Sequence, residues 1–221
     1  MNQMRTRHSL RFVYVYYEGE GSERAYLRFL RSRFHDVVVI RGKKGFYPTA
    51  KQDLKKPDSD LNIKWNDIDE IWFFFDIDPD AMMDGKLNSW NNLESLIRKI
   101  RRKSKKINIR LLMTTGCIEY WFLLHFQLTQ PAMGGQPFKD KVLRQLQRYV
   151  PRYRKSAEEI IKTFADSNME RAIENGQRVM QSVDRNIHLT QEEKNQQLYT
   201  SGATFSNVYE VLIDLKQIQK C

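Results

Sequence analysis

Residues 71–78, with the sequence IWFFFDID, constrain the fold more than any other segment of the chain. Five consecutive bulky apolar residues without alternation are typical of a strand buried on both faces, as in the middle of a parallel sheet. Asp76 and Asp78 close the segment, and residues two apart in a strand point to the same side. We therefore predict that both carboxylates project from the carboxyl edge of a parallel sheet, where open α/β sheets bind ligands.

The segments around this strand predict an α/β fold with a mostly parallel central sheet flanked by helices. Strand signals occur at residues 11–17, 37–40 and 107–114, and helical spacing of apolar residues occurs at 23–34 and 88–104. The order strand, helix, strand favours parallel strands joined by right-handed crossovers. After the Pro- and Gly-rich residues 127–137 the strand signals stop, and helical patterns follow at 138–149, 155–165, 167–183 and 205–219. We predict an α/β core over residues 1–130 and a helical C-terminal region over 138–221 packed on it.

Carboxylates also follow the first predicted strand, in the sequence EGEGSE at residues 18–23. If this strand neighbours the one that ends near Asp78, then Glu18, Glu20, Asp76 and Asp78 meet at one sheet edge. An all-oxygen cluster of this kind suits Mg²⁺ or Mn²⁺. Such sites stabilise the attacking and leaving oxygens in phosphodiester cleavage.

Plainer interpretations of the same residues stay open. Asp76 and Asp78 could be solvated residues that begin a turn, and Ser22 and Glu23 could be helix-capping residues. Glu119 lies in the apolar helical segment 117–126, where a carboxylate rarely stays without a partner. We expect either a cationic side chain or a metal ion to satisfy Glu119.

The charge of the chain favours a polyanionic partner. The formal net charge is +10 over 221 residues, and basic surfaces attract phosphate backbones. The candidate nucleic-acid contacts are Arg101, Arg102, Lys105 and Lys106 at the end of a predicted helix, and Lys43 and Lys44 in a basic segment. Cations at a helix C-terminus also favour the helix dipole, which is the alternative explanation for the first four.

Composition also bears on the compartment. Two lone cysteines, Cys117 and Cys221, indicate a reducing setting without a disulfide framework. No apolar run approaches membrane-spanning length, and the N-terminal residues have no signal-peptide pattern. We expect a cytoplasmic protein with no membrane partner.

Several motifs together resemble a known family. A strand ending in Glu-Gly followed by a later strand ending in Asp-x-Asp resembles the Toprim pattern, and EGEGSERAYLRFL, FFFDIDPD, IEYWFLLHF and YRK (153–155) resemble the RloB-like family. The resemblance implies a Toprim-like fold and a role in bacterial restriction and phage defence beside an AAA- or ABC-type ATPase. It also implies that Glu18 is the Toprim glutamate, that Asp76 and Asp78 are the metal pair, and that Glu119 is a further acidic site residue.

The leading hypothesis is thus a Mg²⁺-dependent Toprim nuclease that acts on RNA, with tRNA as one candidate, or on DNA. The alternative is a non-catalytic module that binds nucleic acid or an ATPase. A nicking and resealing activity ranks last, because the sequence offers no dedicated nucleophilic tyrosine.

Overall fold

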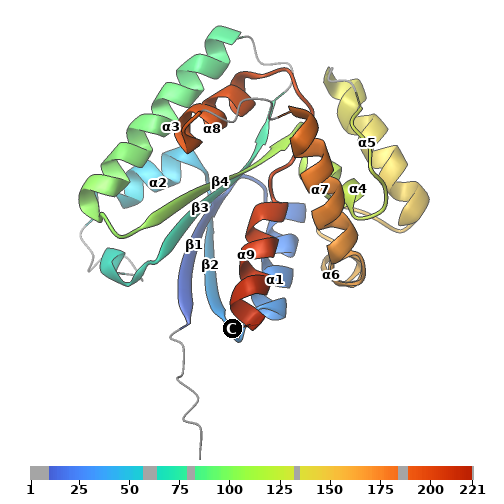
Figure 1. Ribbon diagram of the computed structural model, residues 1–221, viewed down its shortest axis with the longest axis horizontal. Helices are drawn as coiled ribbons and strands as arrows, with labels where there is room; N and C mark the ends of the chain where they lie inside the picture. Colours follow the sequence, from blue (N-terminus) through green and yellow to red (C-terminus); the bar gives the residue numbers. More distant parts are fainter. Residues whose placement is uncertain (1–9, 57–63, 79–82, 132–134, 184–188, 221) are drawn as a thin grey trace, which may run out of the picture.

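The computed structural model describes residues 10–56, 64–78, 83–131, 135–183 and 189–220. At its centre lies a sheet of four parallel strands in the order β2-β1-β3-β4 (Figure 1). The strands are β1 (Arg11–Tyr17), β2 (Val38–Lys44), β3 (Glu70–Ile77) and β4 (Asn108–Thr115). The predicted α/β class is confirmed, and the arrangement is consistent with a Toprim-like fold.

The apolar run predicted as a central strand is β3, which pairs with β1 on one side and β4 on the other. Residues 71–75 are each 0–2 % exposed. Successive side chains of a strand point to opposite sides of the sheet. Because all five are buried, both faces of β3 are covered. This burial explains why the strand lacks the alternation of a half-exposed one.

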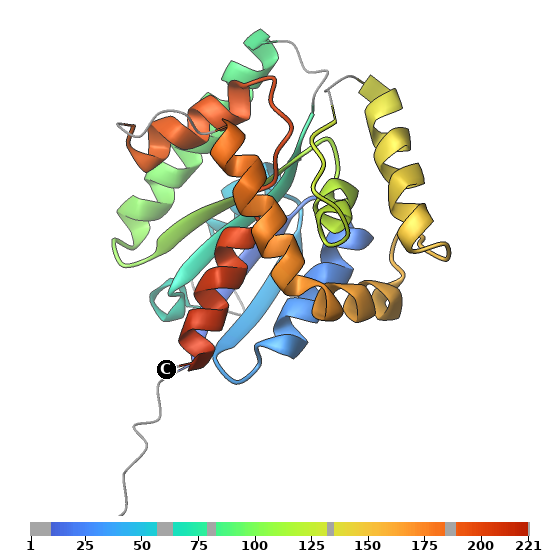
Figure 2. The ribbon, with the colours of Figure 1, turned by 45° about the vertical axis from the view of Figure 1, so that its right-hand side comes forward.

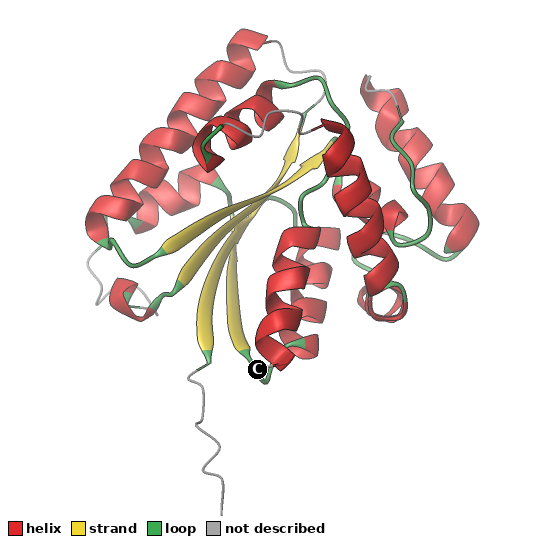
Figure 3. Ribbon diagram, in the orientation of Figure 1, coloured by secondary structure: helices red, strands yellow, loops and turns green. Residues whose placement is uncertain are grey.

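Helices cover both faces of the sheet (Figure 3). They are α1 (Ser22–Arg33), α2 (Tyr47–Asp53), α3 (Met83–Lys103), α4 (Ile118–Leu124), α5 (Gly135–Tyr149), α6 (Glu158–Ser167), α7 (Met169–Val183), α8 (Gln191–Thr200) and α9 (Tyr209–Lys220), with a 3-10 turn, η2 (Trp65–Asp67). Tyr199 of α8 contacts Phe75, and Tyr26 of α1 contacts Phe74. Because Phe74 and Phe75 are consecutive strand residues, α8 and α1 cover opposite faces.

The last part of the chain returns to the sheet. Ser206 forms an isolated antiparallel bridge with Thr114 of β4, and the Asn207 side chain hydrogen-bonds the backbone of Leu111 and Met113. Asp214 of α9 accepts hydrogen bonds from Arg11 and Arg110 at 2.6 and 2.7 Å. In Figure 2, helices α5 and α6 lie to one side of the sheet, and α7 crosses in front of it.

Some element boundaries differ from the prediction. β2 continues through the basic residues 41–44, beyond the strand predicted at 37–40. Helix α2 begins at Tyr47, because Pro48 suits a first helical turn. Helix α8 was missed, because Leu198 is its one buried residue and it shows no apolar stripe. Within the described residues, no helix is both long and apolar enough to cross a membrane.

Candidate functional site

The carboxyl ends of β1 and β3 bring Glu18 and Asp76 together. The register pairs Tyr17, the last residue of β1, with Phe74 of β3, so Glu18 lies level with the end of β3. The Glu18 Oε2 atom accepts a hydrogen bond from the backbone N–H of Asp76 at 3.3 Å. Glu18 is exposed as a residue, yet the partial burial of its carboxyl group raises its pKa. The acidic residues of two neighbouring strands thus meet at the carboxyl edge.

Asp76 is the most strongly perturbed acid in this group. Its Oδ1 atom is buried and has no hydrogen-bond partner. Burial raises the pKa of Asp76 well above its ordinary value, and Glu23, Glu18 and Glu119 raise it further, in that order. Lys139 opposes this shift. A buried carboxyl group with three acidic neighbours and an unsatisfied oxygen is a site that attracts a cation or a proton.

Glu23 belongs to this acidic group, which the sequence left open because helix capping explained the residue about as well. It lies in the first turn of α1 and is 9 % exposed. Burial raises its pKa, and backbone N–H groups of Glu23 and Gly19 lower it. A Cβ atom at Gly19 would lie 2.4 Å from Glu23 Oε2, so the glycine permits this close approach. The Glu23 carboxylate therefore accepts hydrogen bonds from backbone N–H groups at the start of α1 and also adds negative charge to the site.

Glu119, at the start of α4, has hydroxyl partners. It is 3 % exposed, and its Oε1 atom accepts hydrogen bonds from Tyr153 Oη at 2.7 Å and Ser22 Oγ at 3.0 Å. The two hydroxyl groups also lie 2.8 Å apart. The expectation of a cationic side chain or a metal ion as its partner therefore missed these two donors, and neither Ser22 nor Tyr153 was predicted for the site. Burial and the nearby Glu119 and Asp76 carboxylates raise the pKa of the Cys117 thiol.

Asp78 and Glu20 lie on the solvent side of the carboxyl edge. Asp78 is exposed, and Glu18 and Asp78 both add to the effect of burial in raising the pKa of the Tyr199 hydroxyl. Glu20 forms an ion pair with Lys44 at 3.0 Å and is not among the carboxylates that raise the pKa of Asp76. The convergence of Glu20 with Asp76 stays a prediction.

The carboxylate oxygens of the site fit a hard divalent cation, but only one that needs few protein ligands. Among the described residues, no group of three or more His, Cys, Asp or Glu side chains is arranged to hold a metal ion. Mg²⁺ needs fewer protein ligands than such a group would supply, because it commonly keeps several waters and binds one or two protein carboxylates. The unpartnered Asp76 Oδ1 atom and the adjacent Glu18 carboxylate offer such a pair.

The predicted basic contacts are spread over the molecule. Lys43 donates to the buried Asp53 at 2.8 Å, which makes it part of an internal ion pair. Arg101 pairs with Glu192 of α8. Because α3 runs back between parallel β3 and β4, its last turn lies at the amino edge of the sheet, roughly 30 Å along the helix from its start. Exposed Arg102, Lys105 and Lys106 therefore lie far from the acidic group.

Comparison with known proteins gives one match. A family model described as RloB-like protein matches residues 13–215, from β1 into α9. No curated protein and no solved structure matches the chain.

Proposed function

The chain belongs to the RloB-like protein family, and from this membership and its acidic site we propose that it is a Mg²⁺- or Mn²⁺-dependent nuclease. The proposed reaction is hydrolysis of phosphodiester bonds in RNA or DNA. The observation that carries it is the buried, unpartnered Asp76 Oδ1 atom beside Glu18 at the carboxyl edge of a parallel sheet. Function rather than folding explains such an arrangement, because like charges and desolvation make it unfavourable in the empty protein.

In this proposal Asp76 and Glu18 hold the cation, and Asp78 approaches it from the solvent side. A bound Mg²⁺ supplies charge stabilisation for phosphate oxygens during displacement. Where Asp76 alone holds the cation, Glu18 instead moves a proton in the reaction as a general acid–base. Ser22 and Tyr153 hold Glu119 in one orientation beside Asp76, so that the negative field of the site is fixed before substrate arrives.

The cellular role is proposed from the family resemblance. We place the protein in the cytoplasm as an effector of defence against phage, with nucleic acid as its substrate and an AAA- or ABC-type ATPase as its partner. The net charge of +10 supports a nucleic-acid partner, since it favours phosphate backbones.

A non-catalytic binding module is the second candidate, and a specific observation favours it. Lys139 lowers the pKa of Asp76 and of Glu18, and Lys155 lowers that of Glu23. These lysines offset part of the negative charge without a metal ion. In that case the carboxyl edge would be a docking surface for a protein or nucleic acid.

A cleavage assay separates the two candidates. Labelled RNA and DNA are incubated with the parent protein, Asp76→Asn, Glu18→Gln and the control Asp166→Asn, in Mg²⁺, in Mn²⁺ and in chelator, with and without the partner ATPase. Asp166 pairs with Arg33 on the surface, so its variant matches the chemical change away from the site. We expect Asp76→Asn to abolish cleavage and Glu18→Gln to lower it by about 10²–10⁴-fold.

Two outcomes count against the nuclease. Equal cleavage by the parent and Asp76→Asn would remove the reaction from this site. A parent protein that binds nucleic acid but does not cleave it under any of these conditions would favour the binding module.

A further inference from the structure

A groove runs along the edge of the sheet formed by β2. Among the described strands, β2 is the outermost on its side, and α1 packs against it. Two adjoining hollows, of about 920 and 210 Å³, share Arg28, Arg31 and Ile40 among their lining residues. We call this surface the α1–β2 groove.

Four arginines line the α1–β2 groove. Arg24, Arg28 and Arg31 stand at positions i, i+4 and i+7 of α1 and therefore share one helix face. Arg41 lines the groove from β2. Arg28 pairs with Glu158 of α6, an acidic residue in the lining, whereas exposed Arg24 and Arg31 form no ion pair among the described residues.

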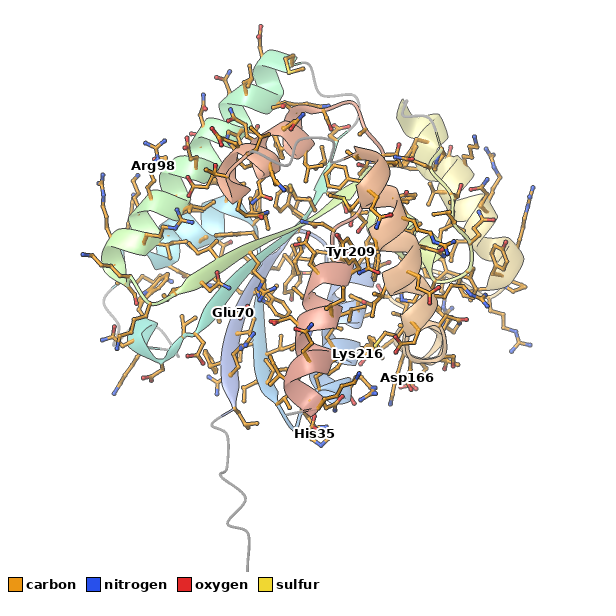
Figure 4. The ribbon with its side chains drawn as sticks, viewed as in Figure 1. His35, Glu70, Arg98, Asp166, Tyr209 and Lys216 are labelled. Carbon is orange, nitrogen blue, oxygen red and sulfur yellow. The ribbon has the colours of Figure 1, made fainter. Side chains whose placement is uncertain are left out.

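The groove begins beside the acidic group. Helix α1 starts at Ser22, next to Glu23, and runs back along the sheet because β1 and β2 are parallel. Arg24 therefore lies one residue from an acidic site residue, and His35, at the far end, lies at the amino edge of the sheet (Figure 4). Arg98 of α3 lies on the other side of the molecule in the same view.

We propose that the α1–β2 groove binds the phosphodiester backbone of a single nucleic-acid strand and leads that strand to the acidic group. The inference rests on the proposed function and says where the nucleic-acid substrate of that nuclease binds. Guanidinium groups present planar forks that match phosphate oxygens, and cationic grooves of this kind track single-stranded backbones. From Arg24 to Arg31 the helix rises about 10 Å, so the two guanidinium groups can contact different phosphates of one backbone.

The test is a binding titration in chelator, where no cleavage occurs. Fluorescently labelled 20-nucleotide RNA and DNA of one sequence, single-stranded and duplex, are titrated with the parent protein at several salt concentrations. The test variant is Arg24→Gln with Arg31→Gln. The control is Arg171→Gln with Arg178→Gln, which removes two exposed arginines that are also seven residues apart, on α7.

We expect the test variant to bind single strands about tenfold more weakly near 0.15 M salt and to lower the salt slope by about 1.4, at about 0.7 per lost phosphate contact. The control should bind like the parent, and the tighter of RNA and DNA identifies the strand. Equal loss in both variants, or a test variant that binds like the parent, would overturn the groove. A parent that binds only duplexes would also overturn it.

The groove and the nuclease can fail separately. A parent that binds through the groove but never cleaves leaves the groove in place and removes the nuclease. If the parent cleaves, Asp76→Asn does not, and the test variant binds as tightly as the parent, the nuclease stands and the groove is removed.

Discussion

Replacing Asp76 by Asn is expected to stabilise the metal-free protein. The Asp76 carboxyl group is buried, carries an oxygen without a hydrogen-bond partner, and faces Glu18, Glu23 and Glu119. Asn keeps the shape of the side chain, removes its negative charge, and adds an amide that can donate to the neighbouring carboxylates. Relief of repulsion and new hydrogen bonds therefore act in the same direction.

The magnitude follows from the unsatisfied oxygen. An unpartnered buried polar group costs about 1–3 kcal/mol, and we expect Asn to recover about 1–2 kcal/mol of this. For a chain of 221 residues, 1 kcal/mol corresponds to about 2–4 °C in melting temperature, so the expected rise is about 2–8 °C.

The gain should depend on pH. The pKa of Asp76 is raised in the folded state, so the folded protein keeps a proton that the unfolded chain loses above about pH 4. The parent therefore loses stability as the pH rises from about 4 through the folded-state pKa of Asp76. Asp76→Asn does not lose stability in this way, so the difference in melting temperature between the variant and the parent should be larger at pH 8 than at pH 5.

The assay is thermal unfolding in chelator at pH 5 and pH 8, repeated with Mg²⁺. Saturating Mg²⁺ at about 100 times its Kd should add about 2.7 kcal/mol to the parent and much less to Asp76→Asn. Asp166→Asn, on the surface of α6, is the matched control. A variant that melts lower than the parent at both pH values would show that Asp76 supports the fold, and equal stabilisation of both proteins by Mg²⁺ would remove the cation from this site.

Tyr153→Phe removes the 2.7 Å donor to Glu119, and because hydrogen bonds to charged groups contribute about 1.5–3 kcal/mol, we expect a lower melting temperature together with slower cleavage. Glu70→Gln is expected to destabilise the protein by about 2 kcal/mol or more without a specific effect on cleavage. Glu70 is 4 % exposed and pairs with Arg11 and Arg110, and breaking a buried pair costs about 3–5 kcal/mol, less here because both arginines keep some hydration.

Each of these variants has a matched control. Tyr149→Phe removes an exposed hydroxyl that donates to Gln127, and Glu94→Gln removes a surface pair with Arg98 worth about 0.3–0.5 kcal/mol. Thermal unfolding of each pair measures the difference. If Tyr153→Phe behaved like Tyr149→Phe in both stability and cleavage, the role of Tyr153 at the site would be refuted. If Glu70→Gln changed the melting temperature no more than Glu94→Gln, the ion network would not stabilise the fold.

The central sheet could be predicted from local patterns because burial leaves its mark along the strands. The apolar run of β3 indicated a strand covered on both faces, and the position of Glu18 at the end of β1 brought it to Asp76. Helix α8 has no such apolar pattern, but its start carries a signal that could have found it. Thr190 and Glu193 form a reciprocal capping box, and the spacing T-x-x-E is visible in the sequence.

The rest of the site depends on contacts between distant segments. Tyr153 reaches Glu119 across 34 residues and Ser22 across 131, and no local period encodes such a contact. Glu20 shows the converse limit, because the sequence could not indicate that Lys44 on the neighbouring strand would pair with it. The YRK motif was visible as a family resemblance, but its hydroxyl function emerges only from the fold.

The ion network under α9 has a consequence for how the protein is made. Arg11 at the start of β1 pairs with Asp214, 203 residues later. During synthesis on the ribosome, β1 emerges before α9 and gains this partner only after the 203 residues that separate them have been made. The bridge between Thr114 and Ser206 imposes a similar delay on β4. Contacts of such long sequence separation form late in folding, so a chain that still lacks residues 206–214 can pair its four strands but cannot make these two contacts.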